Sequence, residues 1–590
     1  MFKFRLISLS LVMVCAFVSV FPQTADKNEE KQKQQNALLE QIIKDANGLR
    51  LPENRALVLA KLGDGFWAKD EKRARQFFQT AVNELVAAQT EAEAEKKQAG
   101  NLYGLIYGTS PRQEILMMIA GRDAEFALDA FYKSRPAKIA QALAAANGAE
   151  KKDSEARQYA QNEAIFEQGL INKFSEQNPQ RALKLFRESL AKGVTYEAIN
   201  LIEKLKTKDL ELANQIAAEV ADKLAATDFE KDAQAASLTV SFVGEYGKKP
   251  DPNQKMIKID DKVLRDLTAK VVKNILKSDE GGYEIEYILP IVEKFAPESL
   301  AALKQKKAKF DKENKREDYD AFNKLIEGNP SPEKLLSEAD KYPDDLKNQI
   351  YYAAAEKTAQ SGNVEGAKKI ISARLPENER ENYLTQINYN LISQAMTAEK
   401  YDEAALLINQ IPAENSRFYY LMQLATTVYQ KKPAENKRQA LNFIEQARAL
   451  IPQPAETLED ISLLMQIAAT LADIEPEQSF QILESLTFQM NEFLEAAAIV
   501  GKYRSEGTVR KGEMIVNSYG SVNGLNNMAQ ILATLKKKDF GRTTVFVNGF
   551  QRLEVRVSLE MQLIENPAPT LDAPASGGSG SGVSVGKSGN

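Results

Sequence analysis

Residues 421–428 read LMQLATTV and residues 464–471 read LMQIAATL, so one short pattern occurs twice in the chain. A third copy of its last six residues, QILATL, stands at residues 530–535. A glutamine followed by Ile or Leu recurs more widely, in steps of 37, 37, 43, 64 and 32 residues, at Gln349, Gln386, Gln423, Gln466, Gln530 and Gln562. A period near 37 residues has room for two helices of about four turns each and their connections. The sequence therefore predicts an all-α fold, an α-solenoid of stacked antiparallel helix pairs with a period of about 32–43 residues.

The second helix of each pair has a packing signature of its own. An Ala is followed four residues later by a large apolar residue, and three residues after that by a small one. A small residue lets two helix backbones approach, and the large one fills the groove between them. The signature occurs at Ala74/Phe78/Ala81, Ala127/Phe131/Ser134, Ala182/Phe186/Ser189 and Ala440/Ile444/Ala447.

One unit of the chain resembles a known repeat family. Leu59-x2-Leu62-Gly63-x2-Phe66, followed by Ala74-x3-Phe78-x2-Ala81, is similar to the tetratricopeptide pattern W-x2-L-G-x2-Y…A-x3-F. The resemblance covers most of residues 36–565 as architecture. Gly63 has few counterparts, the closing proline is mostly absent, and the period varies. A divergent member of the family and a merely similar helical-hairpin solenoid are equal alternatives.

Two further patterns belong to the repeat. RLPEN occurs at residues 50–54 and 374–378, just ahead of Arg55 and Arg380, and Arg417 and Arg556 hold the equivalent place.

Residues 543–563 resemble a β-hairpin, because an Asn-Gly pair at 548–549 separates alternating apolar runs. Aligned without gaps on residues 404–424, the same stretch reads as helix, turn and helix, and we favour that interpretation.

The composition removes several classes of chemistry. The 590 residues include no histidine and a single cysteine, Cys15, so Ser-His-Asp and Cys-His catalysis and sites with His or clustered Cys ligands are excluded. Lys and Arg number 77 against 82 Asp and Glu, and this balance gives no general attraction to nucleic acid. We expect no enzyme activity, no cofactor, no metal and no nucleic-acid partner.

The two ends of the chain differ from the helical middle. Residues 1–25 resemble a signal peptide, because Lys3 and Arg5 precede an uncharged apolar run of 16 residues at 6–21. That run is short for a membrane span, which needs roughly 20 residues. We expect an exported protein, periplasmic or extracellular, with the signal peptide cleaved and no membrane span in the mature chain. An uncleaved N-terminal anchor is the alternative.

The expected organisation has six parts. A charged leader follows the signal peptide, a linker-like break around GKKPDPNQ (247–254) separates two stacks of repeats, and a Pro/Gly/Ser tail ends the chain. The expected bounds are 1–25 for the signal peptide, 26–35 for the leader, 36–245 for the N-terminal repeats, 246–256 for the break, 257–565 for the C-terminal repeats and 566–590 for a disordered tail.

The candidate binding residues are tyrosines and glutamines of the repeats. Tyrosine is a frequent interface anchor and also an ordinary filler between helices. The recurring glutamines offer amide groups to a peptide, or each satisfies a backbone group at a turn between repeats. The candidate partner-binding residues are Tyr352, Tyr383, Tyr420, Gln386 and Gln423.

The resulting hypothesis is a non-enzymatic repeat scaffold that binds a protein or peptide partner on its concave face. The oligomeric state of the protein does not follow from the sequence. Two alternatives remain, an α-helical envelope polysaccharide-active enzyme with paired carboxylates, and a structural spacer.

Overall fold

The computed structural model describes residues 23–96, 111–137, 139–141, 154–230, 232–248, 255–278, 282–313, 316–503, 509–516 and 527–564. Most of the expected signal peptide, Cys15, the tail at 566–590 and part of the 246–256 break lie outside these residues.

The described chain is a succession of helices with one two-stranded hairpin, and the predicted all-α solenoid is confirmed. The helices from the first half are α1 (Gln23–Ala46), α2 (Pro52–Phe66), α3 (Glu71–Lys96), α5 (Pro111–Arg122), α6 (Ala124–Lys133), α8 (Ser154–Phe174), α9 (Pro179–Leu190), α10 (Tyr196–Lys208), α11 (Leu210–Ala226), α12 (Ala233–Tyr246), α13 (Asp261–Lys277) and α14 (Gly282–Phe295). The elements that follow are η1 (Pro297–Ser299), α15 (Leu300–Glu313), α16 (Arg316–Glu327), α17 (Pro332–Glu338), η2 (Ala339–Lys341), α18 (Asp344–Gln360), α19 (Val364–Arg374), α20 (Glu377–Thr397), α21 (Tyr401–Asn409), α22 (Glu414–Lys431), α23 (Pro433–Arg448), α24 (Leu458–Ile474), α25 (Pro476–Gly501), β1 (Val509–Arg510), β2 (Glu513–Met514), α26 (Met528–Lys538), α27 (Phe540–Asn548) and α28 (Leu553–Ile564).

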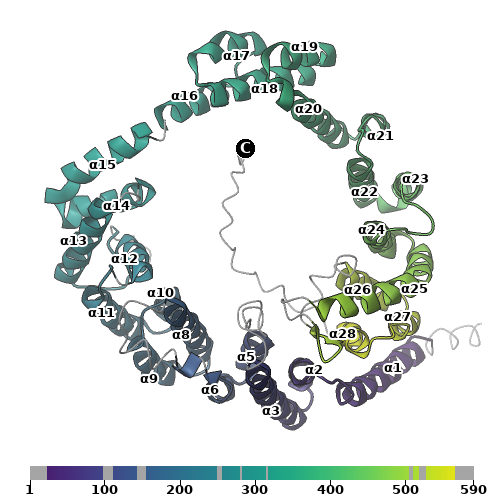
Figure 1. Ribbon diagram of the computed structural model, residues 1–590, viewed down its shortest axis with the longest axis horizontal. Coiled ribbons are helices and arrows are strands. Elements are labelled where there is room, and N and C mark those ends of the chain that lie inside the picture. Colours follow the sequence, from purple (N-terminus) through teal and green to yellow (C-terminus); the bar gives the residue numbers. More distant parts are fainter. Residues whose placement is uncertain are drawn as a thin grey trace, which may run out of the picture. The chain divides into compact units, whose positions relative to one another are not determined.

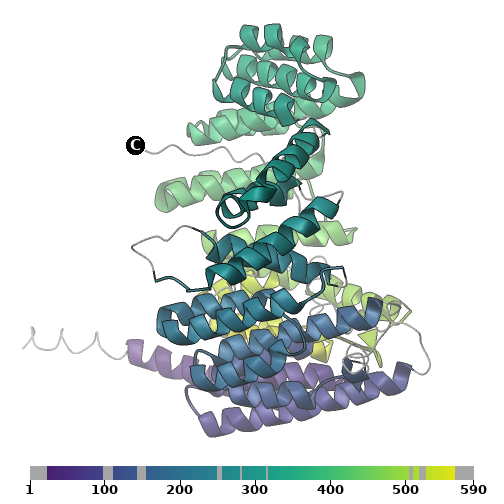
Figure 2. The same ribbon diagram turned by 90° about the vertical axis from the view of Figure 1, so that its left-hand side faces the viewer.

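The helices form two compact units. One unit takes in the described residues up to Ala81 and from Ile451 onward, and the other takes in the described residues from Val82 to Leu450. In the second unit, neighbouring helices pack in pairs such as α18 with α19, α20 with α21 and α22 with α23. Figure 1 shows α19, α21 and α23 on one side of α18, α20 and α22, as a stack of two-helix repeats requires. The helices from α8 to α13 follow one another as successive steps (Figure 2).

The packing signature of the second helices is confirmed at every position that the sequence singled out. The Ala, large and small residues of α3, α6, α9 and α23 are all between 0% and 1% exposed. Gly63 shows how tightly these surfaces meet. A Cβ at Gly63 in α2 would lie 2.5 Å from Cδ1 of Phe78 in α3, so this position of the tetratricopeptide-like unit has no room for a side chain.

The recurring arginines close the turns between repeats. Three of the four stand near the start of a helix and donate to the carbonyl of a buried apolar residue in the preceding turn. These are Arg55 to Leu49 (2.8 Å), Arg380 to Leu375 (3.0 Å) and Arg556 to Phe550 (3.5 Å). Arg417 differs, because its guanidinium pairs with Glu414 at 3.0 Å. The carbonyls at these buried turns need a donor, which explains why the arginine recurs.

The C-terminal region contains one confirmed prediction and one element that the sequence analysis missed. Residues 540–564 form α27, a turn at Gly549 and α28, so the helical interpretation of the Asn-Gly stretch is confirmed. The hairpin of β1 and β2 was not predicted. Its central residues, Lys511 and Gly512, both have positive φ, at 49° and 75°, as a tight primed turn requires.

This hairpin joins the two ends of the described chain within the first unit. The Glu513 carboxylate accepts from the backbone N–H groups of Arg50 (2.6 Å) and Leu51 (3.2 Å), at the start of α2. It also accepts from Nδ2 of Asn54 at 2.6 Å. The N-terminal end of a helix favours a negative charge and leaves N–H groups without partners. Glu513 therefore caps α2 from a position more than 450 residues along the chain.

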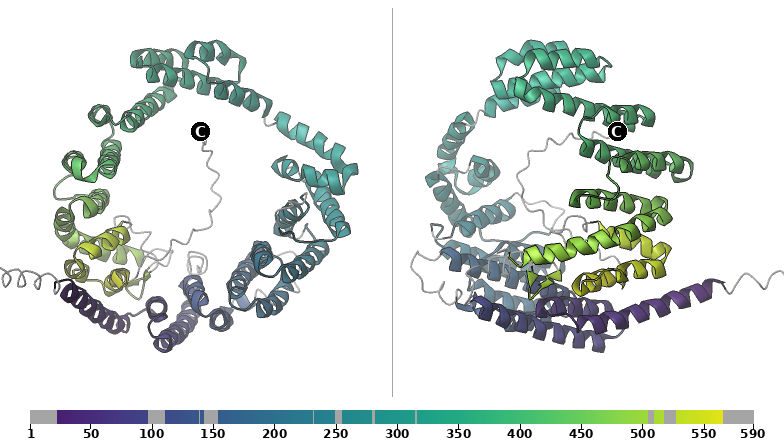
Figure 3. Two further views of the ribbon diagram at one scale, coloured as in Figure 1. Left: turned by 180° about the vertical axis from the view of Figure 1, so that it is seen from behind. Right: turned by 45° about the vertical axis from the view of Figure 1, so that its right-hand side comes forward.

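Further contacts extend this junction. Arg510 pairs with the buried carboxylate of Glu53, and α1 packs along α28, as the right panel of Figure 3 shows. Nη2 of Arg556 in α28 lies 3.5 Å from the carboxylate of Asp45 in α1. The N-terminal and C-terminal helices of the chain therefore share one core.

Two expected boundaries do not coincide with structural ones. Residues 26–35, the expected charged leader, belong to the first turns of α1. The expected break at 246–256 lies between α12 and α13, which pack against each other in the second unit. The divisions between the two units fall instead after Ala81 and after Leu450. Among the described residues, no helix has the length and apolar character that crossing a membrane requires.

Candidate functional site

The structure brings three of the candidate tyrosines, together with Tyr389, into two ring stacks. The rings of Tyr352 (α18) and Tyr383 (α20) have centroids 5.1 Å apart and planes at 32°. The rings of Tyr389 (α20) and Tyr420 (α22) repeat this arrangement at 4.7 Å and 31°. Each stack joins residues 31 positions apart, and the second stack follows the first by 37 residues, the repeat period. We call these four residues the tyrosine ladder.

The rings of the tyrosine ladder are half-buried. Burial raises the pKa of Tyr352, Tyr383 and Tyr420, in the first case helped by the nearby Glu356 and in the second by Glu379. These phenols therefore stay uncharged at neutral pH and keep their O–H donors. Tyr419, beside Tyr420 with its ring edge-on at 5.5 Å, is 60% exposed and extends the aromatic surface toward solvent.

The two candidate glutamines lie on the same helices and are exposed. Gln386 stands three residues after Tyr383 and three before Tyr389, so it lies on the same face of α20 as both stacks. Gln423 stands three residues after Tyr420 in α22. Within the described chain neither side chain has a hydrogen bond, and both are in mid-helix. Among the described residues, neither side chain therefore bonds to a backbone group at a turn, and the binding role of both glutamines stays a prediction.

Other glutamines have that structural role, and the sequence analysis did not single them out. They donate to carbonyls at the ends of neighbouring helices, Gln168 to Gly193 (2.9 Å), Gln177 to Ala120 (3.4 Å) and Gln489 to Ala455 (2.8 Å). None of the three belongs to the periodic Gln-Ile/Leu series. The periodic glutamines and the structural glutamines are therefore different sets.

Two carboxylates border the first ring stack. Glu356 accepts from Nδ2 of Asn390 at 2.7 Å, and the same amide donates to the Tyr352 hydroxyl at 3.1 Å. Glu379 lies close enough to Tyr383 for its charge to help raise the pKa of that phenol. In the part of the chain that the structure describes, neither carboxylate forms an ion pair with a Lys or Arg side chain. The first stack therefore has an acidic border.

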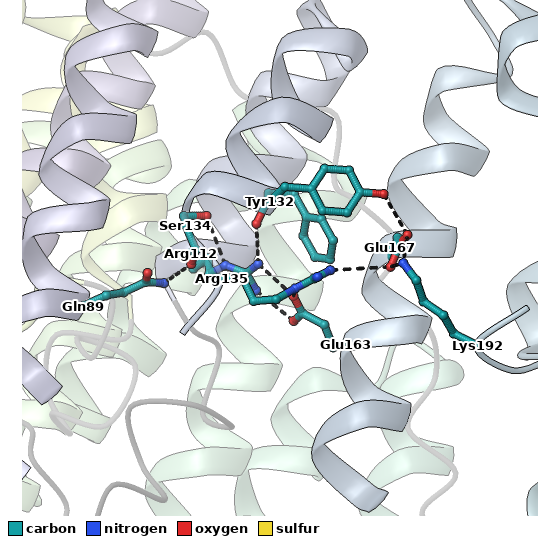
Figure 4. Close-up of polar contacts among 9 residues, drawn as sticks. Gln89, Arg112, Tyr132, Ser134, Arg135, Glu163, Glu167 and Lys192 are labelled. Carbon is teal, nitrogen blue, oxygen red and sulfur yellow. Dashed lines mark hydrogen bonds and ion pairs between the residues drawn. The ribbon is translucent and has the colours of Figure 1, made fainter. Parts of the chain in front are cut away.

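A second polar cluster is built around two buried glutamates of α8, with partners from α5, α6 and the turns after α6 and α9 (Figure 4). Glu163 accepts two hydrogen bonds from Arg112, both at 3.0 Å, and one from Nε of Arg135 at 2.9 Å. Glu167, one turn further along α8, accepts from Nζ of Lys192 at 2.6 Å and from the Tyr132 hydroxyl at 2.8 Å. We call these six residues the buried ionic network.

The charges of the buried ionic network are matched closely. The side chains of Glu163 and Glu167 are 3% and 1% exposed, and that of Arg112 is 9% exposed. Desolvation lowers the pKa of Arg112, while the attraction of Glu163 opposes it. Burial, followed by the charge of Glu167, raises the pKa of Tyr132. Both carboxylates are held by cations and lie away from solvent, so this network fixes the packing of three helices.

The sequence contains a signal for this network that the candidate residues did not include. Glu163 and Glu167 fall on the apolar stripe of α8 with Leu170 and Phe174, both of which are buried. Charged residues are seldom fully buried unless they are paired. Two glutamates on an apolar stripe therefore predict basic partners elsewhere, but their identity depends on tertiary contacts.

The described residues contain no group of three or more Asp, Glu, Cys or His side chains placed to hold a metal ion. No family model and no curated protein matches the sequence. One solved structure with similarity to the chain is titled "Circular tandem repeat protein with novel repeat topology and enhanced subunit contact surfaces". It is 13% identical, with 90% of this chain and 96% of that chain covered, and the TM-score is 0.12. At that TM-score we base nothing on the likeness, and the helical-repeat fold stands on the packed helices themselves.

Proposed function

We propose that this protein is an exported, non-enzymatic helical-repeat scaffold that binds a protein or peptide partner on a concave face carrying the tyrosine ladder. Tyr352, Tyr383 and Tyr420 would supply the contact area, and Gln386 and Gln423 would supply amide groups. Tetratricopeptide-like character is part of the proposal, since the repeat unit at residues 59–81 resembles that family.

The observation that supports this most is the recurrence of the same two-ring stack after one repeat. Packing alone does not require a phenol at these positions. One repeat before Tyr383, the equivalent residue is Leu346, which is buried at 1% exposure and fills its place as an ordinary core residue. Two successive repeats replace that apolar contact with half-exposed rings that have a polar edge. Tyr and amide side chains on one surface are typical of binding sites for protein chains.

The enzyme alternative has less support. The pair of acids with the most favourable electrostatics is Asp45 and Glu560, which lie near the same guanidinium, that of Arg556. Burial and the charge of Asp45 raise the pKa of Glu560 to about 7, as a general acid requires. The Glu560 side chain is 0% exposed and accepts from Nε2 of Gln41 at 2.9 Å. A polysaccharide would therefore not reach it without movement of α1 or α28.

The proposed function is tested with the full-length protein as bait in an extract of its own envelope. The test variant is Tyr383→Ala with Tyr420→Ala, and the control is Tyr196→Ala, which removes a tyrosine that is 43% exposed at the start of α10. Circular dichroism checks that both variants keep their helix content. We expect a partner that wild type and Tyr196→Ala retain and the double variant loses. Equal retention by all three proteins would refute the ladder as the binding surface.

A further inference from the structure

One helix of the first unit carries an exposed apolar surface that is separate from the tyrosine ladder. Large apolar residues that are more than half exposed gather in the second half of α25 and just after its end, namely Phe488 (66%), Ile499 (58%), Val500 (52%) and Tyr503 (80%). We call these four residues the α25 stripe. We infer that the α25 stripe is a self-association surface, on which a second copy of this chain packs with its own α25 antiparallel to the first. This inference goes beyond the proposed function, because the surface and its occupant are both different.

The α25 stripe follows one side of the helix. Phe488, Ile499 and Tyr503 are 11 and 15 positions apart, which is close to three and four helical turns. Ala496 is exposed on the same side, between the large residues. Leu494, on the opposite side, is 0% exposed and belongs to the core. The helix therefore has one apolar side that packs within the chain and a second one that the chain does not cover.

A neighbouring helix adds to the exposed surface. α27 packs beside α25 (Figure 1). Two hydrogen bonds join these segments, from Arg542 to Glu484 (2.8 Å) and from Asn491 to the Gly549 carbonyl (2.9 Å). Val545 lies between these two contacts, at the level of Phe488, and is 70% exposed. Monomeric proteins rarely expose apolar patches of more than a few hundred Å², and larger patches mark interaction sites.

The order of residues along the α25 stripe suits a second copy of the same helix. An aromatic ring stands at each end, and Phe488 and Tyr503 are about 22 Å apart at 1.5 Å per residue. Ala496 lies halfway between them. When two such helices cross antiparallel around a two-fold axis near Ala496, each Phe488 meets the Tyr503 of the other copy, and the small central residue lets the helices approach. A two-fold contact closes on itself, so the assembly stops at a dimer.

Two charged residues favour the antiparallel arrangement. Glu492 and Lys502 are both exposed, and within the described chain neither forms an ion pair. In the antiparallel pairing, Glu492 of one copy lies opposite Ile499 of the other, one turn from Lys502, so two Glu–Lys pairs form across the interface. A parallel pairing would instead bring like charges together. Glu495 is already paired with Arg552 at 2.8 Å.

The area of the α25 stripe indicates a weak dimer. An aromatic side chain offers about 150–250 Å², and the two rings of the stripe are 66% and 80% exposed. With its two aliphatic residues, the stripe would bury roughly 500 Å² per copy, and roughly 1,000 Å² in total is near the lower limit for a specific interface. An anionic membrane is a poorer occupant, because it favours several basic residues beside the apolar face, whereas this stripe has Lys502 next to Glu492. We therefore expect a dimer that dissociates on dilution in the micromolar range.

Sedimentation velocity of the full-length protein over the micromolar range tests the inference. The test variant is Phe488→Glu, and the matched control is Leu406→Glu, which changes an equally exposed residue (67%) of α21 in the second unit. Circular dichroism checks that both variants keep their helix content. We expect wild type and Leu406→Glu to dimerise with the same affinity, and Phe488→Glu to dimerise about 100-fold more weakly or not at all. A monomeric wild type, or equal dimerisation of Phe488→Glu and wild type, would refute the inference.

Exchanging the two charges tests the antiparallel pairing itself. Glu492→Lys places lysines opposite each other, and Lys502→Glu places glutamates there, so each variant alone should dimerise about tenfold more weakly. An equimolar mixture of the two variants forms both Glu–Lys pairs again in the mixed dimer and should recover an affinity close to that of wild type. A mixture as weak as its two components would overturn the pairing.

A lipid surface in place of a second copy is distinguished with the same proteins. Wild type that stays monomeric but sediments with phosphatidylglycerol vesicles, while Phe488→Glu does not, would assign the α25 stripe to a membrane surface and overturn the inference. None of these outcomes bears on the proposed function, because no residue of the tyrosine ladder is changed.

Discussion

Replacing Glu163 with glutamine should loosen the helices around the buried ionic network. The substitution keeps the size of the side chain and removes its charge. Glu163 accepts three hydrogen bonds from two guanidinium groups in a site that is 3% exposed. A glutamine offers one oxygen and turns an NH2 group toward an arginine donor. Arg112 and Arg135 would then be buried cations with reduced compensation.

The size of the effect follows from what remains in place. Breaking a buried ion pair by removing one partner costs about 3–5 kcal/mol. Arg112 keeps the carbonyl of Phe131 at 2.9 Å and the Ser134 hydroxyl at 3.2 Å, and Arg135 keeps Glu167 at 3.6 Å. These contacts place the expected cost at the lower end, about 3 kcal/mol of local stability.

Hydrogen exchange with mass spectrometry measures this locally, which suits a repeat protein that opens in parts. In Glu163→Gln we expect amides of α5, α6 and α8 to exchange about 100-fold faster, because every 1.4 kcal/mol is a factor of ten. The control is Glu125→Gln, which breaks an ion pair with Arg181 whose side chains are 58% and 54% exposed, and which should cost less than about 1 kcal/mol. Equal and small changes in both variants would refute the stabilising role of the network.

Three further predictions concern the first unit. Glu560→Gln should have little effect at about pH 5, where the folded carboxyl is already protonated. At about pH 8 it should stabilise the protein by up to about 3 kcal/mol, because wild type then ionises a buried carboxyl whose folded pKa is about 7 against 4.5 unfolded. Thermal unfolding of both proteins at the two pH values measures this. An equal shift of the melting temperature at both pH values would contradict the prediction. Glu513→Ala removes the cap on α2 and should speed hydrogen exchange of its first turn by about tenfold or more; unchanged exchange there would show that the hairpin contact is dispensable. Gly63→Ala forces a Cβ against the Phe78 ring and should destabilise by about 1–3 kcal/mol in urea unfolding, and a variant as stable as wild type would mean that the two helices have room to separate.

The fold was accessible from sequence because it depends on local periodicity. The Ala, large and small positions at 182, 186 and 189 are fully buried, as their spacing predicts. The tyrosines of the ladder recur at the repeat period, so they occupy corresponding positions in successive repeats. Gln386 and Gln423 were placed on a candidate surface by their period alone, and the structure leaves both exposed on the helices that carry the rings.

What the sequence could not provide depends on contacts between distant residues. No periodicity links Glu513 to the start of α2, and Glu163 gives no sign of which arginines approach it. The hairpin at residues 509–514 is too short for an alternating pattern, and its main local signal is the Lys-Gly pair at the turn. The role of the recurring arginine could not be predicted from sequence either. An arginine that donates to a turn carbonyl and an exposed arginine that binds a ligand have the same sequence signature.

Site-specific photo-crosslinking would show whether the tyrosine ladder is a partner-binding surface. A photoreactive benzoylphenylalanine would replace Tyr419, which is 60% exposed beside the second stack, and in a separate protein Tyr196, which is 43% exposed in α10. We expect a partner adduct at position 419 that disappears when Tyr383 and Tyr420 are changed to alanine, and no adduct at position 196. Equal labelling at the two positions, or an adduct at 419 that survives the loss of both tyrosines, would contradict it.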